Sequence, residues 1–221
     1  MFLDENWKHL IASQDRKGIE LPPRMAGTYN SWNTADRNLI MMGEFIRLRK
    51  PKVFLECGMF EGRTTEYIGK IMAEEVENPT IIAIEAEHYI DNIVNGVATY
   101  KVDDEDWFPV AKARETRIAT IKTIANLNFI YHKGLVGDLL EPILYQHRVD
   151  FIYQDASHVS EWLKSEWPPV ERHAVPGDIV CIDDAFLDMP GNFFDWLEHE
   201  PGWLTKRNIE GGVRQLWCEK R

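Results

Sequence analysis

The feature that most constrains the fold is a repeated alternation of short apolar segments with longer amphipathic ones. The short segments, rich in Val, Ile and Phe, are typical of buried strands and lie at 53–55, 81–84, 128–132, 150–153 and 179–182. Segments with helical spacing lie before and between them, at 34–50, 64–75, 107–125, 139–146 and 160–173. Such alternation predicts right-handed βαβ units and a parallel sheet with helices on both faces.

The end of the chain departs from this alternation. Two short apolar segments, 203–208 and 213–218, flank Glu210-Gly211-Gly212, a pattern that predicts an antiparallel hairpin. We therefore expect an α/β fold, a Rossmann-like doubly wound and mostly parallel seven-stranded sheet with a C-terminal antiparallel hairpin. Residues 34–221 would form this domain.

Two other segments lack a clear periodic pattern. Residues 1–33 are polar and are broken by Pro22-Pro23, so we expect an irregular N-terminal extension that could act as a lid. Residues 87–106 are acidic and longer than a minimal connection, which predicts either a substrate loop or a solvated loop.

Composition limits the classes of partner and compartment. With 25 basic and 36 acidic residues, the net charge of −11 disfavours binding to nucleic acid or an anionic membrane. No apolar stretch is long enough to span a bilayer, and the N-terminus does not resemble a signal peptide, so we expect a cytoplasmic protein. The 3 cysteines lie in predicted strands without metal-site spacing, which predicts buried thiols.

The turn after the first strand is a candidate ligand site. It contains Glu56, Gly58 and Gly62, and open α/β sheets bind ligands at the carboxyl ends of their strands. The glycines do not match the G-x-G-x-x-G pattern of dinucleotide sites, and Glu56 would repel a pyrophosphate. Glu85 follows the second strand and could accept both hydroxyls of a ribose. A ribose with a cationic amino acid and no phosphate describes S-adenosylmethionine; the alternative is a tight turn whose glycines serve packing alone.

The run Glu56-x-Gly58-x-x-x-Gly62-x-x-Thr65 resembles the first motif of class I S-adenosylmethionine-dependent methyltransferases. Glu85 resembles the acidic residue of their second motif, and the similarity covers residues 34–221. The resemblance implies that the first motif lies along the methionine part of the cofactor and that Glu85 binds the ribose. It also implies that Leu135 and Val136, within Gly134–Asp138, flank the adenine.

Acidic residues follow two further strands. Asp155 and His158 come after the fourth predicted strand, and Asp183 and Asp184 follow the fifth. Neighbouring strands would bring these carboxylates together, where they repel each other unless a cation such as Mg²⁺ lies between them. A metal can lower the pKa of a substrate hydroxyl, and His158 could remove its proton. Alternatively, Asp155 caps a helix, His158 is a surface histidine and Asp183-Asp184 is a solvated pair.

The stretches 149–158 and 177–184 resemble the metal-dependent small-molecule O-methyltransferases, especially the macrocin-type and cephalosporin hydroxylase-like groups. The resemblance implies that Asp155, Asp183 and Asp184 bind the metal, that Asp155 also touches the cofactor, and that His158 is the general base. The chain departs from the pattern at Gln154, where an apolar residue is common. It also has Ala156-Ser157 within the usual Asp-Gly-x-His, and Asp183 where close relatives have glutamate.

The expected activity is methyl transfer from S-adenosylmethionine to a hydroxyl of a small molecule, assisted by a metal. The alternatives are a metal-independent methyltransferase, a nicotinamide-dependent oxidoreductase and a silent nucleoside-binding module. The sequence does not identify the acceptor, and it is compatible with a homo-oligomer.

Overall fold

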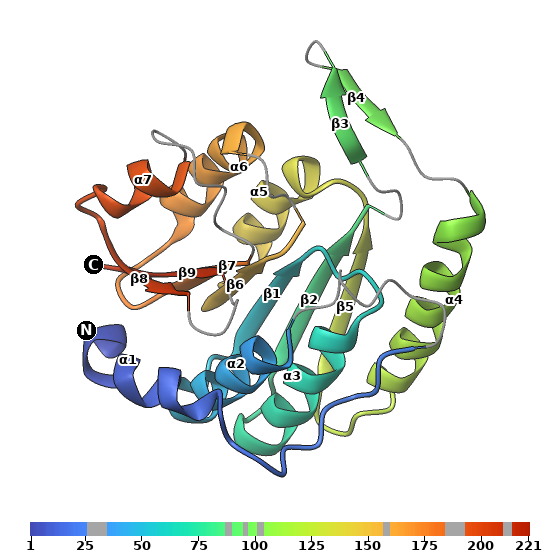
Figure 1. The fold of residues 1–221 in the computed structure, drawn as a ribbon, viewed down its shortest axis with the longest axis horizontal. Helices are drawn as coiled ribbons and strands as arrows, with labels where there is room; N and C mark the ends of the chain where they lie inside the picture. The colour runs from blue at the N-terminus through green and yellow to red at the C-terminus, as the bar shows by residue number, and fades with distance from the viewer. Residues whose placement is uncertain are drawn as a thin grey trace.

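The computed structural model describes residues 1–25, 35–86, 90–94, 97–100, 104–156, 160–183, 193–209 and 214–221. Its main sheet has seven strands in the order β5-β2-β1-β6-β7-β9-β8 (Figure 1). These strands are β1 (Val53–Cys57), β2 (Thr80–Glu85), β5 (Asn128–Lys133), β6 (Phe151–Gln154), β7 (Ile179–Ile182), β8 (Trp203–Asn208) and β9 (Gln215–Lys220). The first five are parallel, and β9 runs antiparallel to both β7 and β8. The predicted fold class and the C-terminal antiparallel pair are confirmed.

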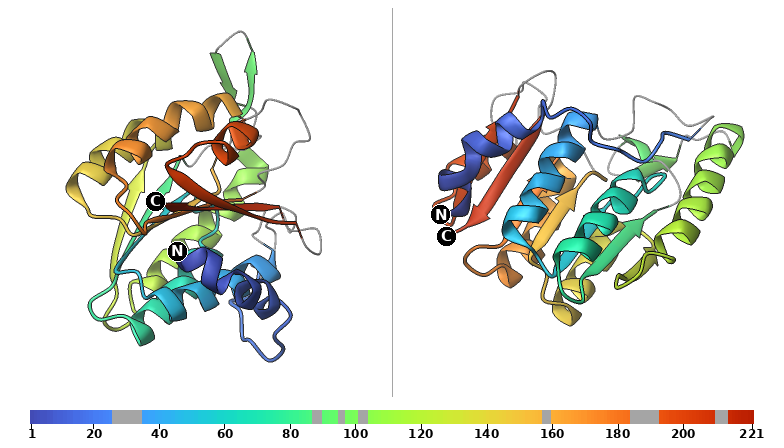
Figure 2. Two further views of the ribbon diagram at one scale, coloured as in Figure 1. Left: turned by 90° about the vertical axis from the view of Figure 1, so that its left-hand side faces the viewer. Right: turned by 90° about the horizontal axis from the view of Figure 1, so that it is seen from below.

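Helices cover both faces of the sheet (Figure 2). They are α1 (Phe2–Ser13), α2 (Asp36–Arg49), α3 (Arg63–Glu75), α4 (Asp104–Ile121), α5 (Val136–Gln146), α6 (Ser160–His173) and α7 (Phe193–Glu198). Successive strand side chains point to opposite faces. Phe151 and Tyr153 of β6 therefore pack with α1, α2 and α3, whereas Ile152 packs with α5, α6 and α7. All three cysteines are free and buried, as the strand patterns predict.

The N-terminus differs from its predicted irregular structure, because residues 2–13 form α1. Leu3 and Leu10 are fully buried in the core cluster that also contains Phe45 of α2. The first amides of α1, those of Phe2 and Leu3, donate hydrogen bonds to the carboxylate of Glu219 on β9. The stabilising partner lies at the other end of the chain, where a local sequence window cannot show it. A boundary between an extension and the domain at residue 33 stays a prediction.

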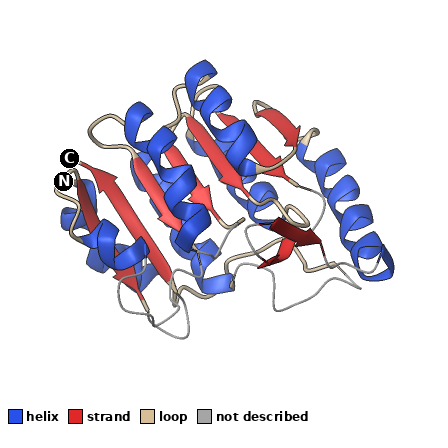
Figure 3. Ribbon diagram, turned by 90° about the horizontal axis from the view of Figure 1, so that it is seen from above, coloured by secondary structure: helices blue, strands red, loops and turns tan. Residues whose placement is uncertain are grey.

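The acidic segment after β2 is also more regular than predicted. Strands β3 (Ile90–Val94) and β4 (Val97–Tyr100) form a separate antiparallel pair, which Figure 3 shows apart from the main sheet. Isoleucine and valine favour strands, and the acidic residues around them obscured that signal in the sequence. Helix α4 begins at Asp104 instead of 107, and the short helix α7 was not predicted. Among the residues described, no helix is long and apolar enough to cross a membrane.

Candidate functional site

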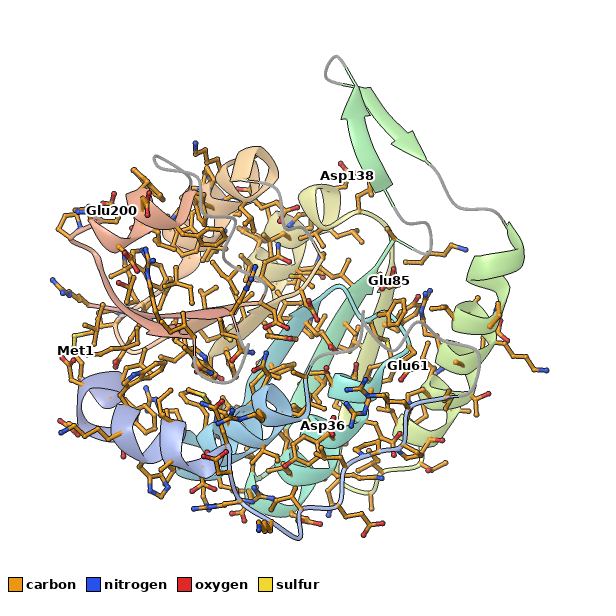
Figure 4. All side chains as sticks on the ribbon, in the orientation of Figure 1. Met1, Asp36, Glu61, Glu85, Asp138 and Glu200 are labelled. Atoms are coloured by element: carbon orange, nitrogen blue, oxygen red, sulfur yellow. The ribbon has the colours of Figure 1, made fainter. Side chains whose placement is uncertain are left out.

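The carboxyl ends of five parallel strands meet at one edge of the sheet, with Glu85 at the upper end of β2 (Figure 4). Backbone hydrogen bonds continue past the ends of the strands. They join Gly58 N to Ile84 O (2.9 Å), Gly134 N to Glu85 O (3.0 Å), Asp155 N to Cys57 O (2.8 Å) and Asp183 N to Gln154 O (2.9 Å). A connected network of backbone hydrogen bonds therefore joins the strand ends that carry the sequence-predicted residues.

The turn from Gly58 to Gly62, called the glycine turn below, needs glycine at both ends. Gly58 has φ +90°, and a Cβ there would lie 2.7 Å from the backbone N and Cα of Ala156. Gly62 has φ +81° and is the N-cap residue of α3. The missing side chain of Gly58 thus lets the glycine turn approach Ala156, in the loop after β6. The spacing of the motif does not reveal this contact.

Glu56 lies under this turn in β1. Its side chain is 1% exposed, and the Thr65 hydroxyl of α3 donates a hydrogen bond to its carboxylate. Burial, with a smaller contribution from the nearby carboxylate of Glu85, raises the pKa of Glu56 to about 8, although the hydrogen bond from Thr65 opposes the rise. The group therefore favours its protonated form at neutral pH, and a cation beside it would favour ionisation.

Glu85 is buried and holds the glycine turn from the neighbouring strand. Its carboxylate accepts a hydrogen bond of 2.6 Å from the backbone N–H of Phe60. Arg114 of α4 lies 4.0 Å from the other carboxylate oxygen and also donates to the carbonyl of Phe60. At the next strand end, Leu135 and Val136 begin α5, Leu135 as its N-cap residue.

Asp155 and Asp183 meet around the hydroxyl of Tyr153. The distances from Tyr153 Oη are 3.2 Å to Asp155 Oδ2 and 2.8 Å to Asp183 Oδ2. Asn38 of α2 donates a hydrogen bond of 2.9 Å to Asp183 Oδ1. Tyr153 is fully buried, and Asn38 and Asp183 are nearly so. The structure thus brings together two of the three predicted metal ligands.

The remaining members of the predicted constellation, His158 and Asp184, lie outside the described residues. In the part of the chain that the structure covers, no group of three or more His, Cys, Asp or Glu residues could hold a metal ion. The donor chemistry of the described pair still fits a hard cation. A phenol has one proton, so Tyr153 can satisfy only one of the two facing carboxylates at a time. A shared proton or a nearby cation would relieve the remaining repulsion.

Sequence reasoning missed two members of this cluster, Tyr153 and Asn38. Tyr153 could have been found, because residues i and i+2 of a strand share a face and Asp155 follows it at that spacing. Asn38 gave no such signal, since nothing local relates α2 to the end of β7.

Two further hydrogen bonds hold the N-terminal segment to helices α3 and α4. Arg63, the first residue of α3, donates from Nε to the carbonyl of Pro22 at 2.8 Å. Arg117 of α4 donates from Nη2 to the carbonyl of Pro23 at 2.8 Å and pairs with Glu66 at 2.5 Å. Side chains of two helices, α3 and α4, therefore hold the segment that contains Pro22 and Pro23. Residues 26–33, the remainder of the extension predicted to act as a lid, lie outside the described residues.

No protein-family model matches the chain, and no curated protein is significantly similar to it. Solved structures are similar in fold. A methyltransferase of Podospora anserina, PaMTH1, bound to S-adenosylhomocysteine, aligns at a TM-score of 0.63 and 12% identity, over 100% of this chain and 97% of its own. An O-methyltransferase of Bacillus cereus in complex with the same molecule gives 0.58 and 14%, over 99% and 90%.

A third similar structure is TomG of Streptomyces achromogenes, an O-methyltransferase of tomaymycin synthesis in complex with S-adenosylmethionine. It gives a TM-score of 0.56 and 14% identity, over 86% of this chain and 82% of its own. At such identities the likeness establishes the fold: the chain has the Rossmann-like fold of class I methyltransferases.

Proposed function

We propose that the protein transfers a methyl group from S-adenosylmethionine to a hydroxyl of a small molecule. The observation that carries the proposal is the placement of Glu56 and Glu85 at adjacent strand ends beside the glycine turn, on a fold shared with S-adenosylmethionine-bound enzymes. Two of the similar structures are named as O-methyltransferases. The net charge of −11 favours a small acceptor over a nucleic acid.

The residues of the chain would divide the work of binding. Glu56 would face the ammonium of the methionine part, and Glu85 would accept the ribose hydroxyls. The glycine turn would place backbone close to the cofactor, and Leu135 and Val136 would flank the adenine. Binding in this orientation would fix the donor methyl near the ends of β6 and β7, which hold Asp155 and Asp183. Proximity and alignment of the reacting atoms would then supply much of the rate enhancement.

A metal ion fits the proposal because it would activate the hydroxyl of the acceptor. Asp155, Asp183 and Asp184 would hold Mg²⁺, which lowers the pKa of a bound hydroxyl when present. The two aspartates that face Tyr153 support this assignment, because their repulsion favours a cation. His158 would remove the proton of the acceptor hydroxyl. A metal-independent methyltransferase would use His158 or proximity alone.

Binding of S-adenosylhomocysteine, measured by calorimetry with and without Mg²⁺, tests the cofactor. We expect the wild type to bind and Glu85→Ala to bind about 1–3 kcal/mol more weakly, because the ribose loses a charged hydrogen-bond acceptor. Thermal stabilisation by NAD and not by S-adenosylhomocysteine would instead favour the oxidoreductase.

Transfer of labelled methyl from S-adenosylmethionine to a panel of small hydroxylated acceptors tests the reaction. Chelation by EDTA should abolish transfer, and Mg²⁺ should restore it. Asp183→Asn should lose transfer while keeping cofactor affinity, since Glu56 and Glu85 lie on other strands. Transfer that is insensitive to EDTA would select the metal-independent alternative.

A further inference from the structure

A buried polar pair lies beneath the loop that follows β6, on the face of the sheet opposite Tyr153. Gln154, the last residue of β6, is 6% exposed and Glu166 of α6 is 5% exposed. Gln154 Nε2 donates a hydrogen bond of 2.5 Å to Glu166 Oε2, and Gln154 Oε1 accepts one of 2.9 Å from the backbone N–H of Ala156. One side chain thus links helix α6 to the loop that carries Asp155.

The two partners of Gln154 fix which way its amide points. An amide has a donor end and an acceptor end, whereas a backbone N–H only donates. The N–H of Ala156 therefore selects the carbonyl end of Gln154 and leaves the NH₂ end for Glu166. Burial raises the pKa of Glu166 to about 7, and the hydrogen bond from Gln154 opposes that rise.

The position of Ala156 matters for the glycine turn. A Cβ on Gly58 would lie 2.7 Å from the backbone N and Cα of Ala156, so the two loops are already in close contact. Asp155 is tied to the same place, because its N–H bonds the carbonyl of Cys57 at 2.8 Å. A displaced Ala156 would therefore move against the turn that is proposed to hold the cofactor.

We infer that Gln154 and Glu166 are positioning residues, which set the loop after β6 against the glycine turn through the backbone of Ala156. The inference rests on the proposed function for its effect on cofactor binding. It also explains why an amide stands at 154, where the resembling families commonly have an apolar residue.

Three variants test the inference. Gln154→Leu removes both hydrogen bonds, and the double variant Gln154→Glu with Glu166→Gln reverses the pair while keeping an acceptor for Ala156. Gln14→Leu is the matched control, because Gln14 is also buried and, as the C-cap residue of α1, bonds Asn208 of β8 at 3.2 Å. Should Gln154→Leu not fold, Gln154→Asn is shorter by one methylene and cannot reach both partners.

The readouts are amide hydrogen exchange of Ala156, followed by NMR, and the affinity for S-adenosylhomocysteine. We expect Gln154→Leu to speed exchange at Ala156 and to weaken affinity about three- to tenfold, the worth of one hydrogen bond. The swapped pair should restore both values, and Gln14→Leu should leave both at the wild-type level.

Unchanged exchange at Ala156 in Gln154→Leu would overturn the inference, as would a loss of affinity that Gln14→Leu matches. A wild type that does not bind S-adenosylhomocysteine would refute the proposed function instead. The exchange of Ala156 would still decide whether the pair holds the loop.

Discussion

At the scale of single residues, binding of the proposed ligand should change the protonation of the buried Glu56 carboxyl group. Its pKa of about 8 means that the free protein holds a proton there at pH 7. A ligand ammonium beside the carboxylate would lower that pKa, so binding of S-adenosylhomocysteine at pH 7 should release up to about one proton. Calorimetry in two buffers with different ionisation enthalpies measures the number released.

Glu56→Gln is the control for this prediction, because its amide keeps an acceptor for the Thr65 hydroxyl but carries no titrating proton. The variant should show no proton release. If wild type and Glu56→Gln give the same buffer dependence, the released proton does not come from Glu56.

The sequence located the acidic residues of the site better than their partners. Glu56, Glu85, Asp155 and Asp183 were predicted at the sheet edge from their places after strands, and they lie there. Two of these partners come from helices: Asn38, which bonds Asp183, and Glu166, which bonds Gln154. Which face of a helix meets which strand end depends on packing across the chain, so a local pattern does not determine it.

At the scale of elements, the glycine turn and the loop after β6 act as one unit. Gly58→Ala would place a Cβ against the backbone of Ala156 in a conformation with φ +90°, so one of the two segments must shift. We expect a loss of about 1–3 kcal/mol in the free energy of unfolding, measured with urea, and a weaker affinity for S-adenosylhomocysteine.

Gly137→Ala is the matched control for Gly58→Ala. Gly137 lies in the first turn of α5, and a Cβ there would meet nothing within 4 Å. Because alanine favours helix more than glycine does, this variant should be neutral or slightly stabilising. Equal losses in both variants would contradict the role assigned to the contact between Gly58 and Ala156.

The elements that were predicted correctly are those whose signal is local. Each parallel strand is a short apolar run, and each predicted helix repeats its apolar residues within its own length. Helix α1 was missed because its cap comes from Glu219 and its core partners lie on α2 and β9. Strands β3 and β4 were missed because acidic residues dominate the composition around them.

At the scale of the whole molecule, two buried carboxyl groups make stability depend on pH. The pKa values of Glu56 and Glu166 rise from 4.5 to about 8 and about 7 on folding. At pH values between the unfolded-state and folded-state pKa of each group, the folded protein binds more protons than the unfolded chain. The free energy of unfolding should therefore fall as pH rises from about 5 to about 8. The slope is at most about 1.4 kcal/mol per pH unit for each group.

Urea unfolding at pH 5 to 8 without ligand measures this slope. The variants Glu56→Gln and Glu166→Gln should each flatten it over the range up to the pKa of the group removed. A slope that persists unchanged in both variants would show that other groups set the pH dependence.

The hydrogen bonds that Arg63 and Arg117 donate to Pro22 and Pro23, together called the clasp here, have an evolutionary consequence. Arg63 and Arg117 bind the two prolines through the main-chain carbonyls of Pro22 and Pro23, and every residue type carries such a carbonyl. Substitution at 22 or 23 can therefore preserve the clasp wherever the backbone path is kept, whereas substitution of either buried arginine removes it. Homologues should vary more freely at the two positions that are held than at the two that hold them.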